Sequence, residues 1–239
     1  MKALLLAAGL GTRLRPLTQN IPKCLVPICG KPLLGYWLEM LDAAGVAPVL
    51  INLHYFAEAV RAYLEGGCFS KSIRTVYEEH LLGTAGTLLK NRGFFDQEPF
   101  MLVHADNLSR FDVKAFIASH LSRPQGCEIT MLTFSTSDPK SCGIVALDRQ
   151  GVVQSFHEKV PNPPGDLANG AVYIIQPSVF EFLESLGKDE IDFSTEVLPH
   201  YVGRISTFHN GVYHRDIGTL DSYRLAQIDF PKLTTPLHG

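Results

Sequence analysis

The sequence predicts an α/β protein with a Rossmann-like, mixed but mainly parallel sheet that is flanked by helices. Continuous apolar runs at residues 2–8 (KALLLAA) and 100–105 (FMLVHA) are typical of central strands that are buried on both faces. In the first half of the chain such runs alternate with segments of helical periodicity, which favours right-handed crossovers between parallel strands. Of the 239 residues, 46% are hydrophobic and 19% are charged, so the chain can bury a sizeable core.

A helix is expected directly after a proline-rich stretch. Between residues 32 and 44, leucines and Trp37 recur at helical spacing, and Gly45 is typical of the residue that ends a helix. The prolines before it argue against a helix there, because proline lacks the amide hydrogen that a helix interior uses. The remaining elements of the first half are expected as a strand at 47–53, a helix at 56–65, a strand at 73–78, a helix beginning near Thr84, and the strand at 100–105.

After about residue 125, strands follow one another without intervening helices. Strand-like runs are expected at 128–134, 143–148, 152–158 and 168–175, followed by a helix from Ser178. The DRQG segment at 148–151 is expected to turn between two of these strands. We therefore expect a single domain over residues 1–239, with an α/β half at 1–125 and a mixed β half at 126–239.

Composition and charge exclude several classes of partner. The net charge of −3 and the lack of a basic stripe argue against nucleic acid. No apolar run reaches the ~18 residues of a membrane span, so no membrane is expected. The cysteines are odd in number and form no CxxC pair, which favours reduced thiols and a cytoplasmic protein over a zinc site or disulfides. They are Cys24, Cys29, Cys68, Cys127 and Cys142.

A glycine-rich loop, GLGTR at residues 9–13, directly follows the first strand. Such loops bind ligands in open α/β sheets, and glycines bring backbone amides close to phosphate oxygens. Arg13 on the loop and Lys23 nearby add two cations. A dinucleotide fingerprint would need glycine in place of Leu14, and a Walker A loop would need serine or threonine after Gly-Lys, where this chain has proline. A plain tight turn is the alternative on this spacing alone.

The loop is part of a longer string. It reads LAAGLGTRLRPLT at residues 6–18, PKCLVP at 22–27 and GKPL at 30–33. This string resembles the signature of the sugar-1-phosphate nucleotidyltransferases, and the resemblance extends to about residue 225. It implies the nucleotide-diphospho-sugar transferase fold and an enzyme that joins a nucleoside triphosphate to a sugar 1-phosphate and releases pyrophosphate. The half at 1–125 would bind the nucleotide and the half at 126–239 the sugar phosphate, and a homodimer is the expected assembly.

The resemblance assigns the triphosphate to the glycine-rich loop. The nucleotide-binding residues implied there are Leu6, Ala8, Gly9, Gly11 and Thr12. Arg13 and Lys23 match the family's catalytic cations, which hold phosphates and neutralise charge at the reacting α-phosphorus.

Two aspartates are candidates for a Mg²⁺ site. Asp106, also assigned to catalysis, follows the strand at 100–105, although Ala105 replaces the glycine usual in the family; Asp216 lies in a DIGT segment that matches the family's second motif. Mg²⁺ usually takes one or two carboxylates together with substrate phosphates. Capping of a strand or helix end is the alternative role for both aspartates. His104 should share a strand face with Asp106, in a supporting or packing role rather than as a metal ligand.

The EHLLGTAGT segment at residues 79–87 resembles the family's base-recognition segment. Its implied nucleotide-binding residues are Glu79, Gly83, Thr84 and Ala85, with Glu79 accepting hydrogen bonds from the base. Gly83 and Gly86 are expected to let backbone groups reach the base, and a helix cap is the alternative role of Thr84. The LGTAG form is similar to that of guanylyltransferases acting on mannose or heptose 1-phosphates, so GTP is the expected nucleotide.

The sugar phosphate is assigned to segments of the second half. In FHEK at 156–159, Lys159 would pair with the 1-phosphate and Glu158 with sugar hydroxyls, although an exposed Glu-Lys pair is otherwise an ordinary surface feature. Asn169 matches the asparagine that contacts the sugar. Gly143 is expected to end a strand and to let the sugar ring approach closely. The DFSTE segment at 192–196 also fits the family pattern and is expected to be structural.

Three alternatives stay open. Uridylyl enzymes carry related base-recognition strings, so a uridylyl- or thymidylyltransferase acting on a hexose or amino-sugar 1-phosphate is the alternative within the family. A catalytically silent nucleotide-sugar-binding subunit would be expected to lack Arg13, Lys23 or an aspartate, and all of these are present. An NAD-binding oxidoreductase is disfavoured by Leu14.

Overall fold

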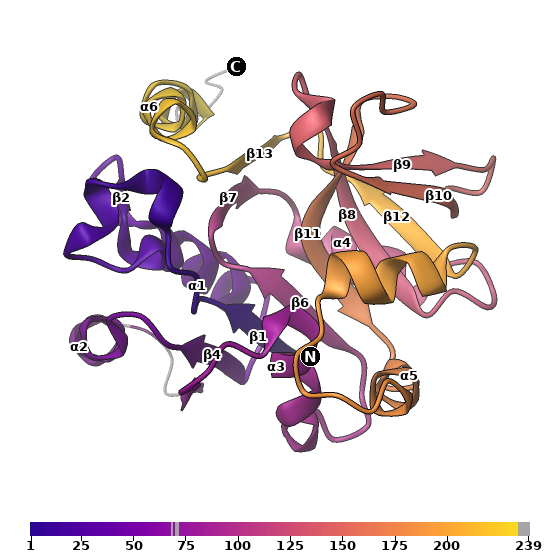
Figure 1. Ribbon diagram of the computed structural model, residues 1–239, viewed down its shortest axis with the longest axis horizontal. Helices are drawn as coiled ribbons and strands as arrows, with labels where there is room; N and C mark the ends of the chain where they lie inside the picture. The colour runs from indigo at the N-terminus through magenta and orange to yellow at the C-terminus, as the bar shows by residue number, and fades with distance from the viewer. Residues whose placement is uncertain (68, 70–71, 234–239) are drawn as a thin grey trace.

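The structure, a computed structural model, describes residues 1–67, 69 and 72–233, so Cys68 lies outside the described residues. Within them a nine-stranded mixed sheet runs through the molecule, with helices on both of its faces (Figure 1). The strand order along the main path is β10-β9-β11-β6-β1-β4-β5, with β8 paired to β11 and β12 paired to β8. The predicted fold class is confirmed.

The first half of the chain forms the parallel part of the sheet. Its strands are β1 (Lys2–Leu6), β4 (Val49–Leu53), β5 (Ile73–Tyr77) and β6 (Phe100–His104), and its helices are α1 (Leu33–Ala43), α2 (Ala57–Gly66) and α3 (Gly83–Lys90). All of them lie where the sequence predicts them. β1 is shorter than the predicted run at 2–8, so Ala7 and Ala8 already belong to the loop that follows the strand.

The second half adds antiparallel strands beside β6. Its elements in this sheet and around it are α4 (Val113–Leu121), β8 (Ile129–Ser135), β9 (Gly143–Leu147), β10 (Val153–Glu158), β11 (Leu167–Ile175), α5 (Val179–Ser185), β12 (Ile205–His209) and α6 (Leu220–Asp229). The predicted strands and α5 are confirmed, whereas α4, β12 and α6 were not predicted. Gly143 begins β9, which corrects the expectation that it ends a strand.

Two short ribbons lie outside the main sheet. β2 (Pro27–Ile28) pairs with β3 (Lys31–Pro32), and β7 (Asn107–Arg110) pairs with β13 (Tyr213–Asp216). The proline-rich stretch before them forms single 3₁₀ turns at Thr12–Leu14, Leu17–Gln19 and Lys23–Leu25, and no longer helix there. Proline therefore limits this stretch to short turns, as expected.

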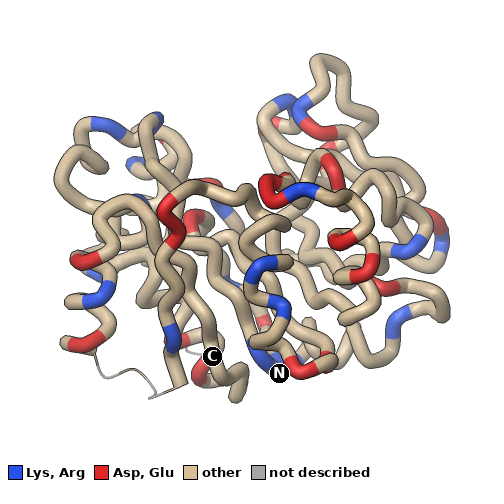
Figure 2. Tube along the Cα trace, turned by 60° about the horizontal axis from the view of Figure 1, so that its bottom comes forward, with Lys and Arg blue, Asp and Glu red and all other residues tan. Residues whose placement is uncertain are grey.

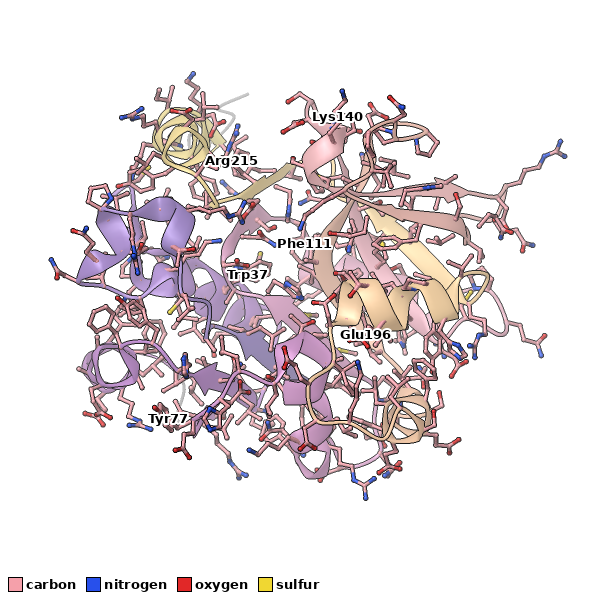
Figure 3. All side chains as sticks on the ribbon, in the orientation of Figure 1. Trp37, Tyr77, Phe111, Lys140, Glu196 and Arg215 are labelled. Carbon is pink, nitrogen blue, oxygen red and sulfur yellow. The ribbon has the colours of Figure 1, made fainter. Side chains whose placement is uncertain are left out.

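Successive side chains of a strand point to opposite faces of the sheet, and each face has its own hydrophobic core. Ala3 and Leu5 of β1 pack on the face covered by α1, α2 and α4, whereas Leu4 packs on the face covered by α3 and α5. Trp37 of α1 and Phe111 lie side by side in the first core, with ring centroids 6.2 Å apart (Figure 3). Each face of the sheet is thus sealed by its own helices, and ligand access is left to the strand ends.

The distribution of charge matches the sequence. Basic and acidic residues are interspersed along the chain (Figure 2). As for the described helices, none combines the length and the apolar character that crossing a membrane would need.

Candidate functional site

The site lies where the chain order of the strands reverses. β4 and β5 follow β1 on one side of it, and the chain then returns to place β6 on the other side. Such switch points open a crevice at the carboxyl ends of the strands. The floor of the crevice is a row of paired residues on four neighbouring strands, which we call the floor row. Leu6 of β1 pairs with His104 of β6 on one side and with Asn52 of β4 on the other, and Asn52 pairs with Val76 of β5.

Two cavities open above this row and share part of their walls. The first, of about 220 Å³, lies over β1, β4 and β5; the second, of about 540 Å³, lies towards β9, β10 and β11. Both are lined by Thr84, His104, Asp106 and Asp192. The crevice is therefore continuous and offers room for two ligands that meet at this shared wall.

The candidate residues divide between the two cavities. The first is lined by the predicted residues Leu6, Ala8, Gly9, Lys23, Gly83, Thr84 and Asp106. The second is lined by Arg13, Thr84, Asp106, Gly143, Glu158, Lys159, Asn169 and Asp216. Four predicted residues line neither cavity: Gly11, Thr12, Glu79 and Ala85.

A cluster of opposite charges marks the shared wall. The Lys23 side chain is only 6% exposed, and its ammonium donates a hydrogen bond of 2.7 Å to Asp106 Oδ2 and lies 3.5 Å from Asp216 Oδ1. Arg13 approaches Asp216 Oδ2 at 3.9 Å from a largely exposed position. Burial alone would raise the pKa of Asp106, but the Lys23 charge together with His104 holds that pKa below its usual value.

The two aspartates come together through the β7–β13 ribbon. Asp216, the last residue of β13, pairs with Asn107, the residue that follows Asp106. Trp37 of α1 fixes the other side of this segment by donating its indole N–H to the Asn107 carbonyl at 2.7 Å. Residues more than a hundred positions apart in the sequence are thus held at one point.

The glycine-rich loop is shaped by its own contacts. Gly11 has φ +62°, and a Cβ there would lie 2.9 Å from Thr18 Cγ2. Thr18 in turn donates its hydroxyl hydrogen to the Gly11 carbonyl at 2.7 Å. Gly9, in contrast, has open space where a side chain would be and lines the first cavity. Gly9 thus leaves the loop backbone accessible, whereas Gly11 is needed for the turn itself.

The glycines of the LGTAG segment pack against the backbone of residues 189–191. Gly83 has φ +72°, and a Cβ there would lie 2.5 Å from the Ile191 carbonyl oxygen; a Cβ at Gly86 would lie 2.1 Å from that of Asp189. The Ala85 amide donates to Ile191 O at 2.9 Å. The close approach of residues 189–191 therefore requires glycine at both positions, and since Gly83 also lines the first cavity, the part of these glycines in base binding stays a prediction.

Glu78, rather than Glu79, lies in the first cavity. Glu79 is exposed and lines neither cavity, whereas Glu78 is 1% exposed and lines the first. Glu78 Oε1 accepts hydrogen bonds from Thr87 at 2.6 Å and Asn52 at 3.3 Å, while Oε2 is buried without a partner. The alternation of side chains along β5, which turns Val76 and Glu78 to one face, is the signal that sequence reasoning missed.

The second cavity is built on β9, β10 and β11. Gly143 faces Glu158, whose Oε2 would lie 2.5 Å from a Cβ at that position. Glu158 and Lys159 form an ion pair of 3.2 Å, and the Lys159 side chain is 66% exposed. Asn169 donates to the Tyr173 hydroxyl at 2.7 Å and accepts from the Ala171 amide at 2.9 Å. The segments expected to bind the sugar phosphate therefore do lie together.

The 192–196 segment has both a structural and a cavity-lining position. Asp192 caps the turn by accepting hydrogen bonds of 2.8 Å from the amide and hydroxyl of Thr195. Thr84 joins the segment to α3, since its hydroxyl oxygen accepts from the Phe193 amide at 2.7 Å. Asp192, Ser194 and Thr195 also line the second cavity. Sequence reasoning identified the structural part only.

Two histidines line the crevice. His214 is held by Ser109, whose hydroxyl lies 2.6 Å from its Nδ1, and burial lowers its pKa to about 3. His104 lines both cavities, and burial lowers its pKa as well, against the opposing charge of Asp106. His104 Nε2 is buried without a partner. Sequence reasoning did not assign a ligand contact to either residue.

Comparisons with known proteins agree with this geometry. The model of the nucleotidyl transferase family matches residues 2–232. Mannose-1-phosphate guanylyltransferase of Mycobacterium tuberculosis is 30% identical over 239 residues, covering 98% of this chain and 66% of that protein. UTP–glucose-1-phosphate uridylyltransferase of a Synechocystis strain is 31% identical, covering 84% and 55%. The chain thus spans about half to two thirds of these relatives.

A solved structure has the same fold over almost its full length. The crystal structure of HddC from Yersinia pseudotuberculosis complexed with GMP-PN superposes with a TM-score of 0.79 at 28% identity. The match covers 96% of this chain and 99% of that chain. The architecture described above is therefore that of a solved protein with a nucleotide analogue bound.

Proposed function

Because the chain belongs to the nucleotidyl transferase family, we propose that it transfers a nucleotidyl group from GTP to a mannose- or heptose-type sugar 1-phosphate. One observation carries the proposal: the buried Lys23 ammonium lies beside Asp106 and Asp216 where the two cavities meet. A nucleotide in the first cavity and a sugar phosphate in the second would bring two phosphates to this wall. Preorganised charge at such a point is the main catalytic need of phosphoryl-type transfer.

The reaction needs no protein nucleophile. An oxygen of the sugar 1-phosphate attacks the α-phosphorus of GTP in line, and the bond from the α-phosphorus to the bridging oxygen of the β-phosphate breaks. Pyrophosphate leaves, and the GDP-sugar remains. Because the attacking phosphate is already anionic, a general base is not required. Lys23 and Arg13 neutralise charge on the phosphates, and the cavity walls hold the two reactants in line.

The carboxylates of the site fit a magnesium ion. Asp106 and Asp216 offer oxygen ligands, which Mg²⁺ favours, and the Lys23 ammonium beside both shows that they stabilise positive charge. The described residues contain no group of three or more His, Cys, Asp or Glu side chains placed to hold a metal. Substrate phosphates and water would therefore complete the coordination. When bound, Mg²⁺ would supply charge neutralisation to the phosphates.

Glu78 supports guanine as the base. Guanine presents two adjacent donors, N1–H and the N2 amino group, to a carboxylate, whereas uracil and thymine present one N–H between two carbonyl oxygens. The unpartnered Oε2 of Glu78 needs a donor, and the cavity that it lines is the one assigned to the nucleotide. HddC from Yersinia pseudotuberculosis, a related protein, has a crystal structure complexed with GMP-PN, whose base is guanine.

Pyrophosphate release tests the proposal. The protein is assayed with GTP, UTP, dTTP, ATP and CTP against mannose, heptose, glucose and N-acetylglucosamine 1-phosphates, with and without Mg²⁺. We expect Mg²⁺-dependent turnover that is fastest with GTP and a mannose- or heptose-type phosphate. Turnover with UTP or dTTP alone would refute the guanylyl assignment and leave the reaction class. No turnover with any pair would refute the class.

Variants of neighbouring glutamates test how the base is read. Glu78→Gln exchanges a carboxylate for an amide that also carries a donor, so we expect the preference for GTP over UTP to fall by at least about tenfold. Glu79→Gln is the matched control, because Glu79 is exposed outside both cavities. An unchanged preference in the Glu78 variant, or an equal change in both, would contradict the assignment.

We extend the proposal to compartment and assembly. The described cysteines Cys24, Cys29, Cys127 and Cys142 all carry free thiols, which supports a reducing, cytoplasmic environment. The homodimer stays a prediction, which light scattering of the purified 26.4 kDa chain checks directly. A monomer mass at working concentrations would contradict it.

A further inference from the structure

Buried polar atoms without partners converge on one cavity. In the described part of the chain, two buried side-chain polar atoms have no hydrogen-bond partner, Glu78 Oε2 and His104 Nε2. Both residues line the first cavity. Folded proteins leave few such groups, because an unpartnered buried polar atom is costly. Their placement around one cavity indicates that a ligand supplies the missing partners.

His104 stands at the middle of the crevice. In the floor row it is the neighbour of Leu6, with Asn52 beyond Leu6 on the side of the base. It lines the second cavity as well, together with Asn169 on β11. A substrate pair laid along the row would therefore place its base near Glu78 and its sugar near Asn169. The substrate group above His104 would then lie between the base and the sugar.

The imidazole of His104 is free to take a new partner. Neither ring nitrogen has a hydrogen bond to the described protein, and its aromatic neighbour Tyr173 meets it edge-on, with ring centroids 6.4 Å apart. The other polar residues of the shared wall already have partners: Thr84 bonds the Phe193 amide, and Asp106 bonds Lys23. His104 thus differs from its neighbours in that it supports nothing in the fold through a hydrogen bond.

We propose that His104 binds a substrate hydroxyl group where the two cavities meet, and that it selects substrates by that hydroxyl. The proposal rests on the proposed function. A hydroxyl both donates and accepts, so it pairs with an imidazole in either tautomer. Lys23 and Arg13 already provide cations for the phosphates, and Glu78 faces the base. The hydroxyl comes either from the ribose of the nucleotide or from the ring of the sugar 1-phosphate.

Deoxy analogues identify the contact. His104→Leu, which is nearly isosteric and apolar, is compared with the wild type using GTP, its 2′- and 3′-deoxy analogues, and sugar 1-phosphates that lack one hydroxyl each. We expect kcat/KM of the variant to fall by about tenfold or more with intact substrates, and to match the wild type with the analogue that lacks the contacted hydroxyl. The ribose arm and the sugar arm distinguish the two sources. His104→Asn keeps a donor and an acceptor and is expected to retain more activity than His104→Leu.

Thermal unfolding separates this role from a structural one. His104→Leu loses no hydrogen bond within the protein, so its melting temperature should equal or exceed that of the wild type. His120→Leu is the matched control, because His120 is also buried but has both nitrogens partnered, by Thr130 Oγ1 at 2.7 Å and Gln176 Nε2 at 2.8 Å. That variant should melt at a lower temperature.

The outcomes are distinct. An equal loss of kcat/KM with every analogue, no loss with any substrate, or a fall in melting temperature as large as that of the His120 variant would each overturn the role of His104. If the His104→Leu protein does not fold, His104 has a structural role, and the proposed binding role is overturned in the same way. If the wild type turns over substrate and the His104 variants give any of these results, the role of His104 is refuted and the proposed function stands. Absence of wild-type turnover with every substrate pair refutes the proposed function and this proposal together.

Discussion

Replacing Lys23 by methionine removes the ammonium that lies between the two carboxylates of the site. Unit charges 2.7 Å apart, the distance from Lys23 Nζ to Asp106 Oδ2, attract by about 6 kcal/mol at an effective dielectric constant of about 20. Desolvation of the buried ammonium offsets most of this attraction. Because the Asp106 side chain is 38% exposed, water screens part of the remainder, and we expect a loss of about 1–3 kcal/mol in the free energy of unfolding at neutral pH.

The pH dependence of this loss has a defined sign. The folded-state pKa of Asp106 is lowered, so its ion pair contributes stability above the unfolded value of about 3.9 and loses that contribution as the pH falls through the folded value. The stability difference between the wild type and Lys23→Met should therefore be full at neutral pH and shrink below about pH 4. Urea unfolding followed by circular dichroism between about pH 3 and 8 measures it.

The same substitution should remove most of the activity. Deleting one preorganised charge from a transfer site typically lowers the rate by about 100-fold or more, and we expect that loss in kcat/KM for pyrophosphate release. Lys31→Met is the control, since Lys31 pairs with Glu39 outside both cavities and should keep wild-type kinetics. A Lys23 variant with kcat/KM within threefold of the wild type, or a stability difference that does not vary with pH, would refute the reasoning.

Three further outcomes follow from the structure. Gly83→Ala places a Cβ 2.5 Å from the Ile191 carbonyl oxygen at φ +72°, so urea unfolding should show a loss of about 2–4 kcal/mol; a loss below about 1 kcal/mol would contradict the close approach. Gly143→Ala crowds Glu158 Oε2 and should raise KM for the sugar 1-phosphate about tenfold with KM for the nucleotide unchanged, and steady-state kinetics that show the reverse would disprove the assignment of the second cavity. Burial lowers the pKa of His120 to about 4, so the unfolded chain binds a proton first and stability should fall by about 3 kcal/mol as the pH drops from about 6.5 to 4. In urea unfolding, the stability of His120→Leu should vary less with pH over this range than that of the wild type. An unchanged pH dependence would contradict the assigned role of His120.

The local pattern of the sequence predicts most of the sheet. β1 and β6 are continuous apolar runs, and α1 has its apolar residues at helical spacing, so periodicity alone places them. The β7–β13 ribbon could not be predicted in this way. Its strands have four residues each, and what defines them is their pairing across a long sequence separation, which periodicity does not report.

The part of the site that follows β1 could be predicted from its residue types. Glycine, arginine and lysine after β1 are a signature of phosphate binding, and the structure brings Arg13 and Lys23 to the aspartates. That Glu78 rather than Glu79 lines the first cavity could not be predicted, because two adjacent glutamates look alike in a motif and differ only in the strand face to which each one turns. The packing of Gly83 and Gly86 against residues 189–191 could not be predicted, because that segment is about a hundred residues away in the chain.

The β7–β13 pairing also joins an early part of the chain to a late one. A ribosome-bound polypeptide that has exposed only its first two hundred residues would contain the glycine-rich loop, Lys23 and Asp106, yet Asp216 would still be inside the exit tunnel or unsynthesised. Until β13 has emerged and paired with β7, Lys23 has only the carboxylate of Asp106 beside it, and not that of Asp216. Asp216 is therefore the last member of this charge cluster to be made, and the cluster is complete only when β13 has paired with β7.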